Sequence, residues 1–230
     1  MKILELPITF EFNGGINCIY PSLIVRNDEL TLVDTGYPEF LTLIENEIIR
    51  HGYNMSQLKH IIITHYDDDH IGSLHDFKEK YPWVAIIASE VESDSISGQV
   101  GAERLAQAED MLESMPPEQV EFGKWFVQQL KSLKHVPVDH KVQDGDMILD
   151  NECKVLATPG HTSGHISLYF PSLNSVITGD AAVKDKDELV VANPHFCLHL
   201  GKAEESLAKL KELEAETYYC YHGGTFKPSV

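Results

Sequence analysis

The sequence predicts an α/β fold in which strands and helices alternate and pack in layers. Strand-like runs of β-branched residues, such as 61–63, stop abruptly at polar side chains, as is typical of buried strands. Between these runs lie segments whose apolar residues recur at the spacing of a helix. The 230 residues are enough to bury a large core. We therefore expect one domain over residues 1–230, with a helical insertion at about 89–135.

The N-terminal third of the chain is expected to be mostly strand. Polar turns at 13–15 and 27–29 separate apolar runs at 8–12, 16–25 and 30–34, which predicts an antiparallel meander. A helical stripe at 40–51 follows and ends at a glycine. The remaining elements are expected as helices at about 71–80 and 203–213, and as strands at 61–63, 84–88, 142, 147–149, 154–157, 166–170, 175–178 and 217–221.

The segment at about 89–135 interrupts this alternation and predicts a helical hairpin. Residues 103–115 and 121–133 have helical composition, and two prolines separate them. The second helix carries Phe122, Trp125 and Phe126 near helical spacing. We interpret the hairpin as a lid over a substrate pocket or as a dimer element. Simple packing onto the core remains an alternative.

The most informative stretch is 61–72, Ile-Ile-Ile-Thr-His-Tyr-Asp-Asp-Asp-His-Ile-Gly. Alternation along an extended turn would direct His65, Asp67 and Asp69 to one side and leave Tyr66 and Asp68 on the other. His70 then joins the first set, where the chain bends into a helix. Carboxylates this close repel one another unless a cation lies among them. A metal site and a solvated acidic turn both explain such a stretch taken alone.

Three more metal-competent residues follow strand-like runs in the same way. They are His161, Asp180 and His222, and each lies beside glycine. Functional sites of open α/β folds lie at the ends of strands. A single histidine at a strand end is more often structural, but four such strand ends together indicate a metal centre.

With these residues in place, the chain resembles the metallo-β-lactamase superfamily from Asp34 to His222. The family motif His-x-His-x-Asp-His corresponds here to His65-x-Asp67-x-Asp69-His70. The resemblance implies an αββα sandwich of two mixed β-sheets flanked by helices. It also implies that Asp34 lies behind the ligands and orients one of them by a hydrogen bond. The implied ligand sets are His65, Asp67 and His161 for one metal and Asp69, His70 and His222 for the other, with Asp180 as the bridge.

Position 67 departs from the motif, because the family's second histidine is an aspartate here. One interpretation is that the first metal is lost. The other is that Asp67 is a hard oxygen donor that shifts metal preference from zinc towards manganese and iron. A carboxylate there also resembles the flavodiiron branch of the superfamily. We expect two divalent metal ions, with zinc, iron and manganese as the candidates.

The implied function is a dinuclear metal-dependent hydrolase that uses a metal-bridging hydroxide on an ester, thioester or lactone of a small metabolite. Asp69 or Asp180 would act catalytically by moving a proton. The alternatives are a di-iron oxidoreductase and a non-catalytic metal-binding protein. Asp180 argues against a true β-lactamase, since several of those enzymes have cysteine there. Further histidines, which would be structural or would support a ligand, are His165, His195 and His199.

Composition and charge restrict the partners. A formal net charge of −18 repels phosphates, so we expect no nucleic acid. The four scattered cysteines fit reduced thiols in the cytoplasm. We expect neither a signal peptide nor a membrane span. The end of the chain soon after His222 leads us to expect no C-terminal glutathione-binding domain and no fused flavodoxin. The expected partner is a small-molecule substrate, and a homodimer remains open.

Overall fold

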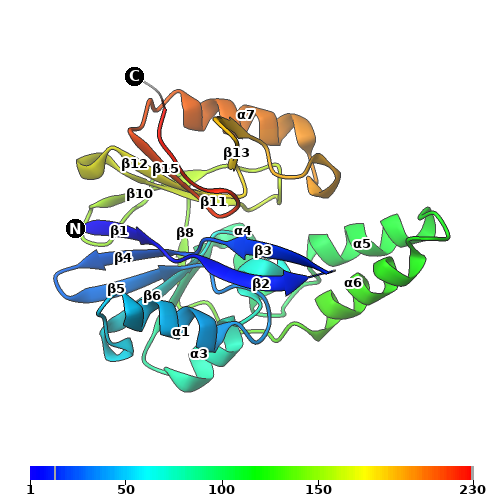
Figure 1. Cartoon of the computed structure of the whole chain (residues 1–230), viewed down its shortest axis with the longest axis horizontal. Helices are drawn as coiled ribbons and strands as arrows, with labels where there is room; N and C mark the ends of the chain where they lie inside the picture. The colour runs from blue at the N-terminus through cyan, green and yellow to red at the C-terminus, as the bar shows by residue number, and fades with distance from the viewer. Residues whose placement is uncertain (13, 229–230) are drawn as a thin grey trace.

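The computed structural model describes residues 1–12 and 14–228. Within these ranges two six-stranded sheets lie face to face, and helices cover their outer faces (Figure 1). Strands pair both parallel and antiparallel in each sheet. The predicted αββα sandwich of two mixed sheets is therefore confirmed.

The first sheet has the strand order β1-β4-β5-β6-β7-β8. Its inner strands pair in parallel from β5 to β8, which places the carboxyl ends of β5, β6 and β7 at one edge. The outer face is covered by α1 (Leu41–Arg50) and α3 (Leu74–Lys80). The strands are β1 (Lys2–Glu5), β4 (Ser22–Arg26), β5 (Glu29–Val33), β6 (Leu58–Ile63), β7 (Ala85–Ser89) and β8 (His140–Val142).

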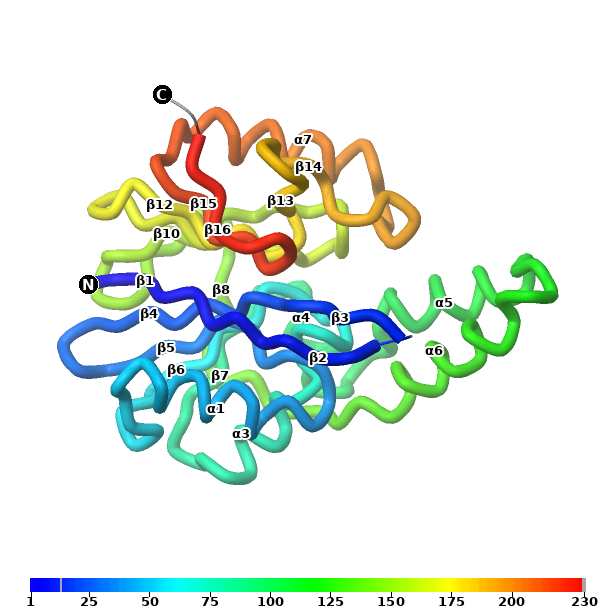
Figure 2. Tube along the Cα trace, viewed as in Figure 1, coloured from blue at the N-terminus to red at the C-terminus, as the bar shows by residue number. Residues whose placement is uncertain are grey.

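The second sheet has the order β16-β15-β12-β11-β10-β9. The helix α7 (Leu200–Lys211) covers its outer face, next to the small β13–β14 hairpin (Figures 1 and 2). The strands are β9 (Met147–Ile148), β10 (Cys153–Ala157), β11 (Ile166–Phe170), β12 (Ser175–Gly179), β15 (Thr217–Cys220) and β16 (Gly224–Phe226), and the hairpin is β13 (Val183–Asp185) and β14 (Glu188–Val190).

The apolar core lies in three layers that match this order of elements. Between the sheets, Ile24 and Ile62 of the first pack with Val155 and Leu168 of the second. A larger cluster fills the space under α1 and α3, and a smaller one lies under α7. Burial on both faces explains why 61–63 is a continuous isoleucine run.

The insertion between β7 and β8 consists of α4 (Glu90–Ile96), α5 (Glu103–Glu113) and α6 (Val120–Ser132). The helices α5 and α6 form a hairpin that projects from the sandwich (Figure 1). The β2–β3 hairpin, Ile8–Phe12 and Gly15–Ile19, projects in the same direction (Figure 2). The rings of Phe12 and Trp125 join these two hairpins, with their centroids 5.7 Å apart.

The structure differs from the sequence expectations in several elements. The run 16–25 is two strands, because the chain breaks at Tyr20 and Pro21 and β4 enters the first sheet while β3 does not. The expected helix at 71–80 is also divided, since the short α2 (Asp68–Ile71) begins inside the metal motif. Elements that were not expected are β1, α4, β13, β14 and β16. Among the described residues, every helix is too short or too polar to span a bilayer.

Candidate metal centre

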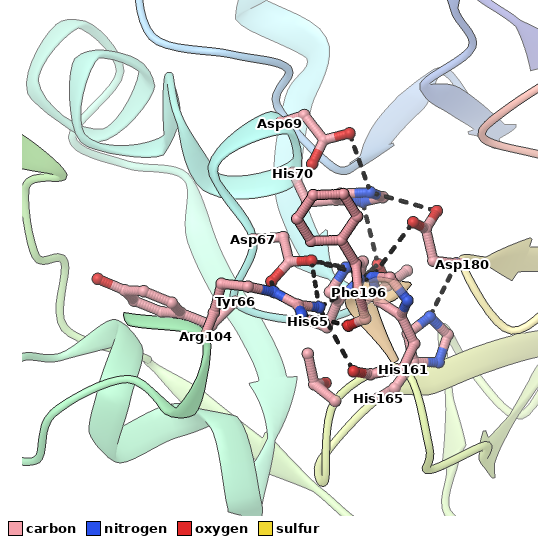
Figure 3. A network of polar contacts seen from close by, with 12 residues as sticks. His65, Tyr66, Asp67, Asp69, His70, Arg104, His161, His165, Asp180 and Phe196 are labelled. Carbon is pink, nitrogen blue, oxygen red and sulfur yellow. Dashed lines mark hydrogen bonds and ion pairs between the residues drawn. The ribbon is translucent and has the colours of Figure 1, made fainter. Parts of the chain in front are cut away.

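The predicted ligands come together where strands of the two sheets end. Figure 3 labels all of them except His222. The motif 65–70 follows β6, and His161 lies in the loop after β10. Asp180 directly follows β12, and His222 lies two residues beyond β15. The close approach of the loop after β10 to the helix α7 requires Gly160, whose φ is +135° and where a Cβ would lie 2.1 Å from the backbone nitrogen of Ala203.

The side chains form two ligand groups. In the first ligand group, one atom each from His65, His161 and Asp180 lies within 4.8 Å of the others. In the second ligand group, the same holds for Asp69, His70 and His222.

The carboxylate of Asp180, which belongs to the first ligand group, also faces the second. Its Oδ2 is 3.4 Å from His161 Nε2, and its Oδ1 is 3.4 Å from His70 Nε2 and 3.5 Å from His222 Nε2. Each oxygen therefore faces a different ligand group, which is the geometry that a bridging carboxylate needs.

Unpaired buried atoms show that this donor set fits metal ions. Among the described residues, five buried side-chain nitrogen or oxygen atoms lack a hydrogen-bond partner, and three of them are His65 Nε2, His70 Nε2 and Asp180 Oδ1. Buried polar atoms are rarely left unpaired, because each costs free energy. All three are atoms that would coordinate a cation in the ligand groups above. Imidazole and carboxylate donors suit zinc, iron and manganese.

Asp34 contacts His70, in keeping with the resemblance, which implies that Asp34 orients one of the ligands by a hydrogen bond. Its Oδ2 lies 2.9 Å from His70 Nδ1 and accepts a hydrogen bond from Thr64 Oγ1, while its Oδ1 accepts from the Thr64 backbone N–H at 2.9 Å. A proton held on Nδ1 leaves Nε2 of His70 free to face the second ligand group. Asp34 adopts a φ of +64°, a left-handed conformation that aspartate tolerates better than most residues.

His165 performs a similar role for Asp180. The backbone N–H of Asp180 donates to His165 Nε2 at 2.9 Å, so Nε2 is unprotonated. The proton on Nδ1 then points to Thr158 Oγ1, 2.8 Å away. Complete burial holds the pKa of His165 well below its usual value, which keeps this tautomer neutral. The other two extra candidates, His195 and His199, are exposed.

Asp67 faces inward but is held by an arginine from the insertion. Arg104 Nε lies 2.8 Å from Asp67 Oδ1, and Nη2 lies 2.8 Å from Oδ2. The same Oδ2 lies 2.9 Å from His161 Nε2 and 3.4 Å from His65 Nε2. Burial opposes ionisation of Asp67, but the Arg104 charge together with the contacts to His65 and His161 outweighs it and holds the pKa of Asp67 well below its usual value. The carboxylate thus lies beside the first ligand group as one half of a bidentate ion pair.

Asp68 does not point away from the site, contrary to the expected alternation. The helix α2 begins at Asp68, so the extended geometry ends one residue earlier than the pattern requires. Asp68 is buried and lines the same cavity as its neighbours. Burial, with the charges of Asp69 and Asp67, raises the pKa of Asp68 to about 8.

A cavity of about 460 Å³ lies over the two ligand groups. Its floor contains Asp67, Asp69, His161, Asp180 and His222. Its walls are largely aromatic and come from β2, the loop between β5 and α1, α6 and the loop before α7. The aromatic residues that line it are Phe12, Tyr37, Phe122, Trp125, Phe126 and Phe196.

Sequence reasoning missed two residues that position the site, Arg104 and Glu92. Glu92 joins the two ligand loops, since it accepts hydrogen bonds from the backbone N–H groups of Tyr66 and Gly164 at 3.3 and 3.1 Å. Its burial raises the pKa of this carboxyl to about 7. The signal that could have found Arg104 was the carboxylate at position 67, because a buried carboxylate needs a cation beside it. The sequence offers three arginines for this role, which are Arg26, Arg50 and Arg104.

Comparison with known proteins gives consistent results. The model of the metallo-beta-lactamase superfamily matches residues 19–222. The "Probable metallo-hydrolase YflN" of Bacillus subtilis is 30% identical over 225 residues, which cover 90% of this chain and 80% of the relative. A hydroxyacylglutathione hydrolase of Brucella anthropi is 28% identical over 190 residues, 78% of this chain. The match spans only 52% of that relative's length.

A solved structure shows the same fold. The metallo-beta-lactamase family protein TTHA1429 of Thermus thermophilus superposes with a TM-score of 0.72 at 22% sequence identity. The superposition covers 98% of this chain and 74% of that protein. Family match, relatives and fold agree with the two ligand groups, and the chain therefore belongs to the metallo-beta-lactamase superfamily and is a metal-dependent hydrolase.

Proposed function

We propose that the protein is a dinuclear hydrolase that cleaves an ester, thioester or lactone next to an uncharged apolar group. One observation carries this proposal: two ligand groups flank Asp180 on the floor of an aromatic-walled cavity. Two divalent cations bound there would supply the nucleophile near neutral pH and polarise the substrate carbonyl.

Asp69 and Asp180 are the residues that we propose to accept and move protons. Both line the cavity. Burial opposes their ionisation, but the nearby charges of His70 and His222 outweigh it and lower the pKa of each carboxyl below its usual value. Ionised carboxylates at these positions can take a proton from the attacking water and release it to the leaving group.

The cavity walls favour an apolar substrate group. The rings of Phe122 and Trp125 on α6 lie 5.6 Å apart, and Phe126 packs edge to face on Phe196 at 5.9 Å. Part of this aromatic wall is exposed, with Trp125 at 44% and Phe122 at 41%. An acyl chain or ring laid against these side chains would remove their apolar surface from water.

The charges of the lining favour an uncharged substrate. Among the described residues that line the cavity, Arg104 is the one arginine or lysine. Its Nε and Nη2 already donate hydrogen bonds to Asp67. A carboxylate or phosphate on the part of the substrate away from the metals would therefore find no free side-chain cation among these lining residues, in a chain of net charge −18. The likeness to a hydroxyacylglutathione hydrolase supports thioester chemistry, while the lining argues against an anionic thiol carrier such as glutathione.

The test is a substrate panel on protein loaded with zinc, manganese or iron(II). It contains p-nitrophenyl esters, N-acyl lactones and acyl thioesters of rising chain length, a glutathione thioester and a phosphodiester. We expect kcat/KM to rise with chain length for the uncharged compounds. Trp125→Ala should remove that dependence, whereas Trp83→Ala, at the other tryptophan, should keep it. Preference for the phosphodiester or the glutathione thioester would refute the substrate class.

The di-iron oxidoreductase alternative has less support in the structure. It depends on the additional negative charge at position 67, which would help the site to tolerate a trivalent ion. Arg104 offsets that charge at 2.8 Å. The hydrolase therefore remains the function that the site supports best.

A further inference from the structure

Among the described residues, Arg104 is the one arginine or lysine that is buried. Its exposed fraction is 2%, and it is the largest fully buried side chain among the described residues. A buried arginine is costly unless all of its donors are paired. The contacts of Arg104 therefore indicate what it is placed to do.

Every part of the guanidinium is engaged, and each partner belongs to the metal centre or its surroundings. Nε and Nη2 form the bidentate pair with Asp67, and Nη2 also lies 3.1 Å from His161 Nε2. Nη1 donates to the side chain of Gln107 and to the backbone carbonyl of Phe196. The ring of Phe196 lies 5.9 Å from the guanidinium carbon.

These contacts join three segments that are far apart in the sequence. Arg104 is in the first turn of α5, Asp67 is in the loop after β6, and Phe196 precedes α7 (Figure 3). The helix α5 packs on α6, which carries the aromatic wall of the cavity. The Arg104–Asp67 pair is thus an attachment point of the α5–α6 hairpin at the metal centre.

The pair also changes the charge of the first ligand group. A carboxylate alone would add a negative charge beside His65 and His161, whereas the pair adds none. A neutral imidazole at position 67 would add none either. A guanidinium next to an imidazole and a cation would in contrast be repulsive.

We propose that Arg104 is a positioning residue that fixes the Asp67 carboxylate, cancels its charge at the first ligand group and secures the α5–α6 hairpin over the cavity. The proposal deepens the proposed function, because it concerns the same dinuclear site. It predicts that positions 67 and 104 are functional only in matched combinations. Asp67 requires the arginine, and a histidine at position 67 requires its removal.

A double-mutant cycle tests this dependence. The variants are Asp67→His, Arg104→Met and the two combined, with Arg50→Met as the matched control on α1, where the arginine is exposed. The readouts are zinc and manganese stoichiometry and affinity by chelator competition. Amide hydrogen exchange over 103–132 reports on the hairpin.

We expect Asp67→His alone to weaken the affinity for one of the two metals by at least about tenfold. The Arg104 guanidinium would then lie beside the imidazole and the cation without a carboxylate to compensate its charge. Adding Arg104→Met should restore that affinity. Arg104→Met alone should speed amide exchange in α5, because the hairpin loses its attachment. It should also increase the rise in Tm that metal binding produces, because the metal must then compensate the negative charge of Asp67. Arg50→Met should change neither metal affinity nor exchange.

Two results would overturn the proposal. One is tighter metal binding by Asp67→His while Arg104 is intact, because Arg104 would then be indifferent to position 67. The other is unchanged hairpin exchange and unchanged metal affinity in Arg104→Met. If Arg104→Met does not fold, Arg104→Lys takes its place, because lysine keeps the charge but cannot form the bidentate pair, and the same increase in exchange is required.

The cycle separates this proposal from the proposed function. Metal affinity could change among the variants as expected while no uncharged ester, lactone or thioester is hydrolysed. That outcome would refute the substrate class and leave the role of Arg104 in place. Hydrolysis of those substrates without the matched dependence would refute the role of Arg104 alone.

Discussion

The hydrogen bonds of Asp34 make Asp34→Asn a sensitive probe of the second ligand group. In the wild type, Oδ1 accepts from the Thr64 backbone N–H and Oδ2 faces His70 Nδ1, each at 2.9 Å. Both groups present protons to the carboxylate, and an amide can accept from only one of them. Asparagine also tolerates the left-handed φ of +64°, so the backbone is not strained by the substitution.

Either orientation of the asparagine has a defined cost. If its oxygen stays on Thr64, its NH₂ group faces His70 Nδ1 and drives the imidazole proton onto Nε2, where a metal requires a lone pair. If the amide is reversed, its NH₂ group faces the buried Thr64 N–H, which loses its acceptor. An unpaired buried donor costs about 1–3 kcal/mol. Loss of a partner that orients a ligand usually weakens metal binding about 10–100-fold, or about 1.4–2.7 kcal/mol.

The assay is competition with a chromophoric chelator for zinc and manganese. The control is Asp150→Asn, which alters an exposed aspartate that pairs with Arg26 at the surface. We expect Asp34→Asn to lose affinity at one of two metals and Asp150→Asn to keep both. Wild-type affinity at both metals in Asp34→Asn would refute the claim that Asp34 sets the tautomer of His70.

Three more perturbations test the site and its support. Removal of metal by chelator should lower Tm by roughly 5–10 °C, because a ligand at 100 times its Kd contributes about 2.7 kcal/mol; an unchanged melting curve would contradict the fit of the ligand groups. Folding raises the pKa of Glu92 from 4.5 to about 7, so the stability from its protonation is complete below pH 4.5 and is lost as pH rises to about 7. In Glu92→Gln, the free energy of unfolding measured in urea should vary less with pH over that range than in the wild type. A pH dependence as steep as that of the wild type would contradict this. Gly160→Ala should cost ~2–4 kcal/mol through the clash with Ala203, whereas Gly201→Ala, where no atom lies within 4 Å, should not destabilise α7; equal effects in thermal melts would contradict the argument.

The α/β fold class and the metal-competent residues at strand ends followed from local sequence patterns, whereas the two-sheet sandwich and the ligand sets were implied by the family resemblance. The isoleucine run 61–63 has the composition of a strand buried on both faces, and it is one. His65, His161, Asp180 and His222 each come after a strand, and strand ends of neighbouring sheets meet at one edge whatever the details of the loops. Apolar strand-like runs that end at metal-competent residues therefore indicated which side chains would lie close together.

The surroundings of those ligands depended on tertiary contacts. Arg104 is 37 residues from Asp67, and its helix has no local pattern that distinguishes an inward arginine from a solvated one. The contact between Phe12 on β2 and Trp125 on α6 was equally hidden, because it joins segments that are far apart in the sequence. Sequence identified the candidate donors of the metal centre, while the tertiary structure decided their charge balance and the shape of the cavity above them, since both depend on which distant side chains are buried together.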